Sequence, residues 1–292
     1  MTAAQARPAD TAGNSPADAS LRRQHIIGSG ELARLLTGDA PPLVLDIRFH
    51  PQLADPRQEF DAGHLPGAHY VHLPSVLADA GPGANRPAAD GALPLPAPAA
   101  LQSSLRALGV DDDSTVVVYD NRNGLSAARG WWVLRWAGVA SVRVLDGGYA
   151  HWVRQGLPTT VEPTPTSPRG SVVVVPGQLP TITTAQAGAL PDAGILLDAR
   201  EEPHFGAGPA AHIPGALNLP SSADVGDQGL LLPEPTLRAR AAAAGIDGSA
   251  AVGAYCGAGV LAAHKVLTLA TLGIESALYV GSFSAWSAVR AD

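Results

Sequence analysis

Cys256 is the only cysteine among the 292 residues, and it stands where a predicted strand gives way to a predicted helix. The apolar run 251–255 is typical of a short buried strand, and an Ala/Leu-rich helical run begins near Val260. Such a junction gathers backbone N–H groups at the positive end of a helix dipole, which favours an anion. A cysteine at that point is favoured as the reactive thiolate. The position predicts a nucleophile, although a free cysteine is more often a small buried hydrophobe.

The loop that follows Cys256 supplies the groups expected to bind the anionic sulfur. Because it carries no charged side chain, its backbone N–H groups would do this work, as an oxyanion hole does for oxygen. These candidate binding residues are Gly257, Ala258, Gly259, Val260 and Leu261. Arg200 and His204, with His264 and Lys265, are the nearby candidates for holding an anionic substrate in this half of the chain.

Composition excludes several classes of function. With 19 Lys and Arg against 26 Asp and Glu, the formal charge is −7 and no basic run occurs, which argues against nucleic acid and anionic membrane partners. A single cysteine allows neither an intramolecular disulfide nor a thiolate metal cage, so we expect no metal and no other cofactor. The chain has no secretory signal pattern and no membrane-spanning apolar stretch, which predicts a cytoplasmic protein with a disordered leader over residues 1–23.

The elements that must position the cysteine occur twice along the chain. In the first half, strands are predicted at 43–47, 115–119 and 142–145, and helices at 30–36, 99–108 and 127–136. The second half repeats this order: LLDAR matches LVLDIR, AHIPGA matches GHLPGA, and LYVGSFSAW matches LDGGYAHW. Asp120 takes the place of Cys256, because TVVVYD in the first copy matches AVGAYC in the second. The first copy is therefore expected to be non-catalytic.

Strands that alternate with helices predict an α/β fold: two tandem domains, each with a mostly parallel central sheet flanked by helices. The expected domains are residues 24–155 and 180–292, joined by a Pro/Thr-rich linker over 156–179, within which SVVVV is expected to run along one domain. Ligands of such sheets bind at the carboxyl ends of strands, where Cys256 falls. We expect the active cleft where the two copies face each other.

The ordered set of motifs, with cysteine replaced by aspartate in the first copy, resembles the two-domain rhodanese-type sulfurtransferases over roughly residues 26–290. This group contains thiosulfate and 3-mercaptopyruvate sulfurtransferases. The resemblance implies that Cys256 carries a persulfide from a small-molecule sulfur donor to cyanide or a thiol acceptor. It also implies that the first domain shapes the cleft.

The residues after the cysteine bear on the donor. The mercaptopyruvate enzymes tend to have Gly-Ser-Gly-Val-Thr there, whereas the thiosulfate enzymes tend to have cationic side chains. The run GAGVL is closer to the first pattern, with departures at Ala258 and Leu261, and His204 stands where the family usually has a substrate-binding arginine. The resemblance favours 3-mercaptopyruvate and leaves thiosulfate as the alternative.

His64 and Asp55 are candidates for a proton relay, because similar mercaptopyruvate enzymes place a histidine and an aspartate at this spacing near the nucleophile. The competing interpretation is structural, since His212 occupies the same place in the second copy and only one copy can approach Cys256. Two carboxylates at strand ends, Asp46 and Asp198, are expected to form buried ion pairs with Arg48 and Arg200.

Two other functions compete with sulfur transfer. Dual-specificity phosphatases share this domain shape, but they need Cys-x5-Arg to clamp phosphate, and this chain has Ala262 at the arginine position. A persulfide carrier or regulatory rhodanese module would load sulfur on Cys256 without releasing it to small acceptors. Turnover distinguishes this module from an enzyme.

Overall fold

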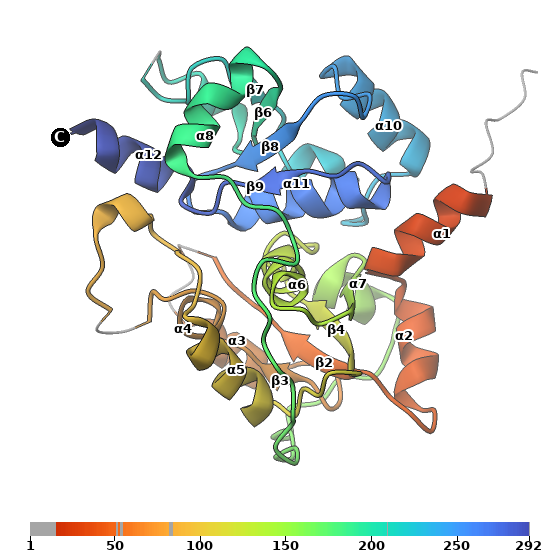
Figure 1. Cartoon of the computed structure of the whole chain (residues 1–292). Coiled ribbons are helices and arrows are strands. Elements are labelled where there is room, and N and C mark those ends of the chain that lie inside the picture. Colours follow the sequence, from red (N-terminus) through yellow and green to blue (C-terminus); the bar gives the residue numbers. More distant parts are fainter. Residues whose placement is uncertain (1–15, 51, 53–54, 82–83, 209, 292) are drawn as a thin grey trace, which may run out of the picture.

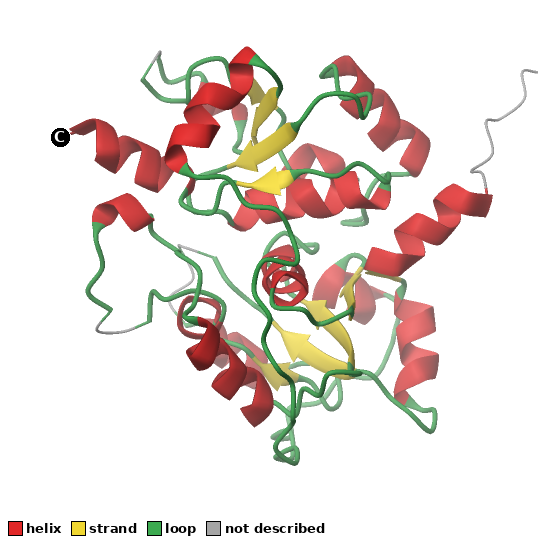
Figure 2. Ribbon diagram, in the orientation of Figure 1, coloured by secondary structure: helices red, strands yellow, loops and turns green. Residues whose placement is uncertain are grey.

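The computed structural model describes residues 16–50, 52, 55–81, 84–208 and 210–291. Two lobes, one from each half of the sequence, lie against each other (Figure 1), and each is built around a sheet with helices outside it (Figure 2). Every strand pairing between the described strands is parallel. The predicted α/β fold with two tandem domains is confirmed.

The two sheets are built on equivalent pairs of strands: β2 pairs with β4 in the first sheet, and β6 pairs with β8 in the second. The first sheet has the order β1-β5-β4-β2-β3, with strands Ile26–Ile27 (β1), Leu43–Asp46 (β2), His69–Tyr70 (β3), Thr115–Tyr119 (β4) and Ser141–Leu145 (β5). The second has the order β7-β6-β8-β9, with strands Ile195–Asp198 (β6), Leu217–Asn218 (β7), Val252–Tyr255 (β8) and Ala277–Leu278 (β9). In both sheets the strand that delivers the Asp120 or Cys256 position is central, which suits its run of buried side chains.

The helices pack around these sheets. The first half contains α1 (Pro16–His25), α2 (Ser29–Leu36), α3 (Pro56–Asp61), α4 (Leu73–Val76), η1 (Ala88–Asp90), α5 (Pro98–Ala107), α6 (Ala127–Trp136) and α7 (Gly148–Arg154). The second half contains α8 (Thr184–Ala189), η2 (Leu190–Asp192), α9 (Glu202–Phe205), η3 (Ser222–Asp224), α10 (Glu234–Ala243), α11 (Val260–Thr271) and α12 (Ser282–Ala291). None of the described helices is long and apolar enough to cross a membrane.

Helices α6 and α11 lie between the two sheets, where they pack against each other (Figure 1). Each follows the strand that leads into Asp120 or Cys256, so the two copies meet through equivalent helices. Nine of the ten residues of α6 and ten of the twelve of α11 are buried. A helix that is apolar around most of its circumference must be covered on all sides, and here the opposite domain completes the cover. One hydrophobic cluster therefore extends through both domains.

The first sheet has two faces with different neighbours. Val116 and Val118 of β4 belong to the cluster shared by the domains, whereas Val117 and Tyr119 belong to a second cluster that also contains Phe60. Because successive side chains of a strand point to opposite faces, the second cluster lies on the face away from α6 and the second domain. This separation decides which predicted site residues can approach Cys256.

The expected leader differs from the structure. Residues 16–23, predicted to be disordered, form most of α1, while residues 1–15 lie outside the described residues. Tertiary contacts explain the difference: α1 packs against α11, and the Arg22 guanidinium donates hydrogen bonds to the carbonyls of Leu231 and Leu232 and to Asp146. Local composition carries no signal for such contacts.

The linker runs along the first domain before it reaches the second. Backbone N–H groups of Gly170, Val172 and Val175 donate to carbonyls of the first domain. Beyond the linker, Thr181 forms a parallel bridge with Leu278 beside β9. The SVVVV stretch thus lies against one domain, as predicted.

Candidate active site

Cys256 lies at the carboxyl end of β8, immediately before the N-terminus of α11. Its side chain is 2% exposed, and the Gly259 N–H donates a hydrogen bond to Sγ at 3.1 Å. Gly259 caps α11 with φ of +81°, a left-handed conformation that favours glycine. A Cβ at this position would also lie 2.9 Å from the Val280 carbonyl oxygen, so the glycine is required by close packing as well. The loop thus directs the N-terminus of α11 at the sulfur.

A second segment holds the cysteine from the other side. The Cys256 N–H donates to the Ser282 hydroxyl at 3.2 Å, and the Phe283 N–H donates to the Cys256 carbonyl at 2.9 Å. Ser282 is buried at a left-handed φ of +53°, and its counterpart in the first copy is Gly148 at +56°. The first copy has glycine, the favoured residue, in this left-handed conformation, whereas the second copy has serine. The use of serine there indicates that its hydroxyl is needed. Sequence reasoning missed Ser282, although the mismatch between GG and GS in the two copies was a signal.

Asp120 occupies the equivalent position in the first copy and fills the loop with its own carboxylate. Four backbone N–H groups donate to it at 2.6–2.9 Å. The donors belong to Arg122, Gly124, Ser126 and Ala127. A fully buried carboxylate with four such donors is a structural anion, and its oxygens occupy the N–H groups that would otherwise bind a substrate anion in that loop.

Arg129 on α6 is a further charged group at the cysteine loop. It comes from the first domain, is fully buried, and places Nη1 so close to Gly259 that a Cβ there would lie 3.0 Å from it. Its Nη2 donates to the Leu93 carbonyl at 3.0 Å. The sequence signal was a lone charged residue inside the apolar run AARGWW, which the pattern of repeats did not assign to a partner.

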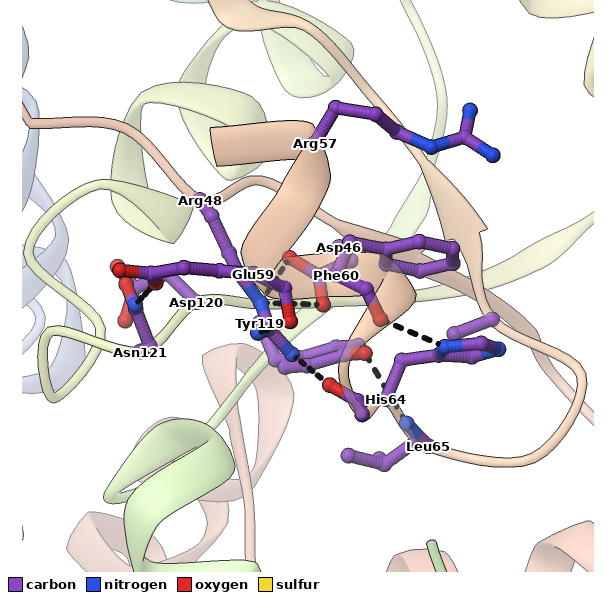
Figure 3. Close-up of polar contacts among 12 residues, drawn as sticks. Asp46, Arg48, Arg57, Glu59, Phe60, His64, Leu65, Tyr119, Asp120 and Asn121 are labelled. Atoms are coloured by element: carbon purple, nitrogen blue, oxygen red, sulfur yellow. Dashed lines mark hydrogen bonds and ion pairs between the residues drawn. The ribbon is translucent and has the colours of Figure 1, made fainter. Parts of the chain in front are cut away.

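The predicted buried ion pairs are confirmed in both copies. Arg48 Nε lies 3.0 Å from Asp46 (Figure 3), and Arg200 Nη2 lies 2.5 Å from Asp198. Arg200 also donates to the Ala211 carbonyl at 2.7 Å and stacks on Phe283. Burial alone would lower its pKa, but Asp198 and Tyr255 together raise the pKa above its ordinary value. Arg200 thus fixes the end of β6 and contacts Phe283, whose N–H donates to the Cys256 carbonyl.

His64 and Asp55, expected as a proton relay, have structural partners instead. His64 Nδ1 lies 2.9 Å from the Phe60 carbonyl, and its ring stacks on Phe60 at 3.9 Å (Figure 3). Asp55 caps the N-terminus of α3 by accepting from two backbone N–H groups. Because Phe60 belongs to the cluster on the far face of the first sheet, the structure does not bring this pair to Cys256. His212 repeats the arrangement on Phe205 at 4.1 Å, which identifies the histidine as a structural feature of each copy.

The other predicted cationic groups are ion-paired, neutral or exposed. Lys265 is buried in an ion pair with Asp224, which Arg240 also contacts at 3.0 Å. Burial lowers the pKa of His264 to about 4, so its ring is neutral near pH 7. His204 lies exposed on the short helix α9, outside the hydrogen bonds around Cys256. Among the described residues, no group of His, Cys, Asp and Glu is arranged to hold a metal ion.

Comparison with known proteins agrees with this architecture. The model of the rhodanese-like domain matches twice, at residues 29–155 and 183–289. The Mycobacterium tuberculosis protein SseB, named as a candidate thiosulfate sulfurtransferase, is 40% identical over 91% of this chain and 95% of its own length. The 3-mercaptopyruvate sulfurtransferase of Escherichia coli K12 is 33% identical over 80% of this chain and 84% of its own.

A solved structure extends the likeness to three dimensions. The crystal structure of SseA from Escherichia coli, described as a 3-mercaptopyruvate sulfotransferase with the rhodanese fold, superposes with a TM-score of 0.77 at 30% identity. It covers 88% of this chain and 98% of its own. With the domain matched in both halves, the chain belongs to the rhodanese-like family as a tandem protein with one cysteine-bearing copy.

Proposed function

We propose that the protein is a sulfurtransferase of the thiosulfate and 3-mercaptopyruvate type that works through a persulfide on Cys256. One observation carries the proposal: the two copies build the same strand–loop–helix junction, and one loop is filled by the Asp120 carboxylate while the other presents a sulfur atom. The anion site is closed in the first copy and carries a nucleophile in the second. The curated relatives named above support the reaction class.

The reaction takes place in two displacements at sulfur. The Cys256 thiolate attacks the transferable sulfur of the donor, so that a sulfur–sulfur bond forms and the donor's bond to that sulfur breaks. Thiosulfate would leave as sulfite with the bonding electron pair; 3-mercaptopyruvate would leave as the pyruvate enolate, which then takes a proton. Cyanide or a thiolate next attacks the outer sulfur, which releases the product and restores the Cys256 thiolate.

The junction suits both anionic forms of the sulfur. The Gly259 N–H already donates to Sγ, and the N-terminus of α11 favours negative charge on the thiolate and on the persulfide alike. Ser282 fixes the cysteine backbone, so the sulfur keeps its direction while the outer atom is added and removed. A reducing compartment such as the cytoplasm keeps this lone thiol available for the cycle.

We propose 3-mercaptopyruvate as the better donor. The loop from Gly257 to Leu261 has no cationic side chain, and Lys265 and Arg200 are engaged with Asp224 and Asp198. Thiosulfate would bring two negative charges to a site where Arg129 is the one described cation without a carboxylate partner. Its second charge would be buried unpaired, which costs several kcal/mol. A donor with one carboxylate is handicapped less.

The first experiment tests the nucleophile. Cys256→Ser should abolish sulfur transfer and leave the fold intact, because the hydroxyl is nearly the same size but does not ionise near neutral pH. Mass spectrometry of the wild type after donor alone should show one added sulfur on Cys256. Transfer by the serine variant above a few per cent of wild type would refute the assignment. A persulfide that forms but never passes to cyanide or a thiol would favour the carrier function.

The second experiment tests the donor. Values of kcat/KM for 3-mercaptopyruvate and thiosulfate, with cyanide as common acceptor, should favour 3-mercaptopyruvate. A tenfold preference for thiosulfate, worth about 1.4 kcal/mol in transition-state stabilisation, would refute the charge argument. Cations from outside the loop would then set specificity.

A further inference from the structure

Arg129 is a buried cation with an incomplete set of partners. Its side chain is fully buried, one nitrogen donates to the Leu93 carbonyl, and Nε and Nη1 have no acceptor among the described residues. No carboxylate in the described part of the chain forms an ion pair with it, whereas the other buried Arg and Lys side chains, Arg48, Arg200 and Lys265, each have one. A buried guanidinium without an anion is strongly unfavourable, so an anionic partner is to be expected.

The unpaired side of Arg129 faces the cysteine loop. Nη1 lies against Gly259, the residue whose N–H donates to the Cys256 sulfur. Burial lowers the pKa of Arg129 to about 10, and the neighbouring Cys256 acts in the opposite direction. The guanidinium therefore stays charged at neutral pH, and the ionisable group beside it is the thiol.

We propose that Arg129, supplied by the non-catalytic domain, is the charge partner of the Cys256 sulfur and holds it as thiolate and as persulfide. This inference rests on the proposed function, since it assigns the group that keeps the nucleophile ionised. The first domain then contributes a charged group to the site as well as its shape. It supplies the positive charge that the loop of the second copy lacks, so the sulfur centre is built across the domain interface.

The other charged groups on the elements around Cys256 are already engaged. On α11, Lys265 pairs with Asp224, and His264 is neutral through burial. At the end of β6, Arg200 pairs with Asp198. Asp90 of η1 lies 3.9 Å from Arg86, and Arg290 at the far end of α12 stacks on Trp286. Arg129 is thus the described cation near the sulfur that has no carboxylate partner.

The test uses the single cysteine as its own probe. Iodoacetamide alkylates only the thiolate, and no other cysteine contributes to the signal, so the pH midpoint of the alkylation rate reports on Cys256 alone. The variants are Arg129→Met, Arg129→Lys and, as a matched control on the same helix, Arg135→Met, whose guanidinium contacts the Ala140 carbonyl away from the site. Circular dichroism and thermal unfolding verify each fold.

Arg129→Met should move the midpoint upward by about 1 pH unit, the order of effect that a nearby opposite charge has on a pKa. Arg129→Lys should retain most of the wild-type midpoint, and Arg135→Met should leave it unchanged. A folded Arg129→Met protein with the wild-type midpoint overturns the proposal. The proposed function is tested separately: it stands if the wild type forms a persulfide and turns over, whatever the midpoint of Arg129→Met. A wild type that forms no persulfide would refute the function itself.

A second measurement does not depend on the folding of Arg129→Met. If the native protein stabilises the thiolate, the difference in unfolding free energy between the wild type and Cys256→Ser should change with pH. It should shift in favour of the wild type as pH rises towards about 8.5, where an unfolded cysteine titrates. A difference that stays constant from pH 5 to pH 9 would show that no cation holds the thiolate, and would overturn the proposal.

Discussion

Replacement of Asp120 by asparagine tests whether the first copy is a structural anion site. The carboxylate accepts four backbone N–H groups, two on each oxygen. An amide keeps one oxygen and turns an NH2 group towards the other two donors, so two N–H groups lose their acceptor whichever way the amide is placed. Each unsatisfied buried donor costs about 1–3 kcal/mol, which gives a loss of roughly 2–6 kcal/mol. That is a large part of the stability of an ordinary domain.

The assay has two parts. Urea unfolding should give the expected loss for Asp120→Asn, whereas the control Asp61→Asn, which breaks only an exposed ion pair with Arg57, should cost at most about 1 kcal/mol. Sulfur transfer per folded molecule should stay near the wild-type level in both. A loss of stability under 1 kcal/mol would refute the hydrogen-bond argument. A folded Asp120→Asn protein as inactive as Cys256→Ser would show that the first copy takes part in the chemistry.

Three further predictions concern other contacts. Ser282→Ala leaves the buried Cys256 N–H without an acceptor; we expect kcat/KM to fall by about tenfold, and unchanged kinetics would contradict a positioning role. Burial lowers the pKa of His264 to about 4, below the roughly 6.5 of an unfolded histidine, so stability should fall as pH drops from 6.5 towards 4. The wild type should lose about 2 kcal/mol more than His264→Gln between pH 7.5 and pH 5 in urea unfolding, and equal losses would contradict this. Arg22→Ala should cost about 1–3 kcal/mol and lower Tm, because two carbonyls of the second domain lose their donor, while the exposed neighbour Arg23→Ala serves as a control without effect.

The sequence was most informative where local pattern and burial agree. The predicted bounds of β4 and α6 match the structure, because the run TVVVY is β-branched and apolar and the helix is apolar between clear turns. The two-residue strands and α1 were missed, since contacts with distant segments define them. The glycines after Cys256 located the junction correctly, because a strand ending in a tight turn before a helix has a local signature.

The rest of the site needed three-dimensional information. His64 was assigned a possible chemical role from its motif, but the motif does not reveal that its ring stacks on the face of the sheet away from Cys256. Arg129, by contrast, was assigned no chemical role from the sequence. It lies far from Cys256 in the sequence and in the other copy, so only the packing of α6 on α11 brings it to the cysteine loop. The spacing of residues within one copy does not indicate which side chain reaches across the domain interface.

The burial of α6 and α11 limits how this protein can evolve. After duplication, two domains are ordinarily independent modules that can be recombined, lost or exchanged. Here the helix that follows the nucleophile has ten of twelve residues buried, with the equivalent helix of the other copy as part of its cover. Separation of the halves would expose an apolar surface on each, and such surfaces promote aggregation. The copy without a cysteine is therefore needed to cover α11, which ties the two halves together as one unit.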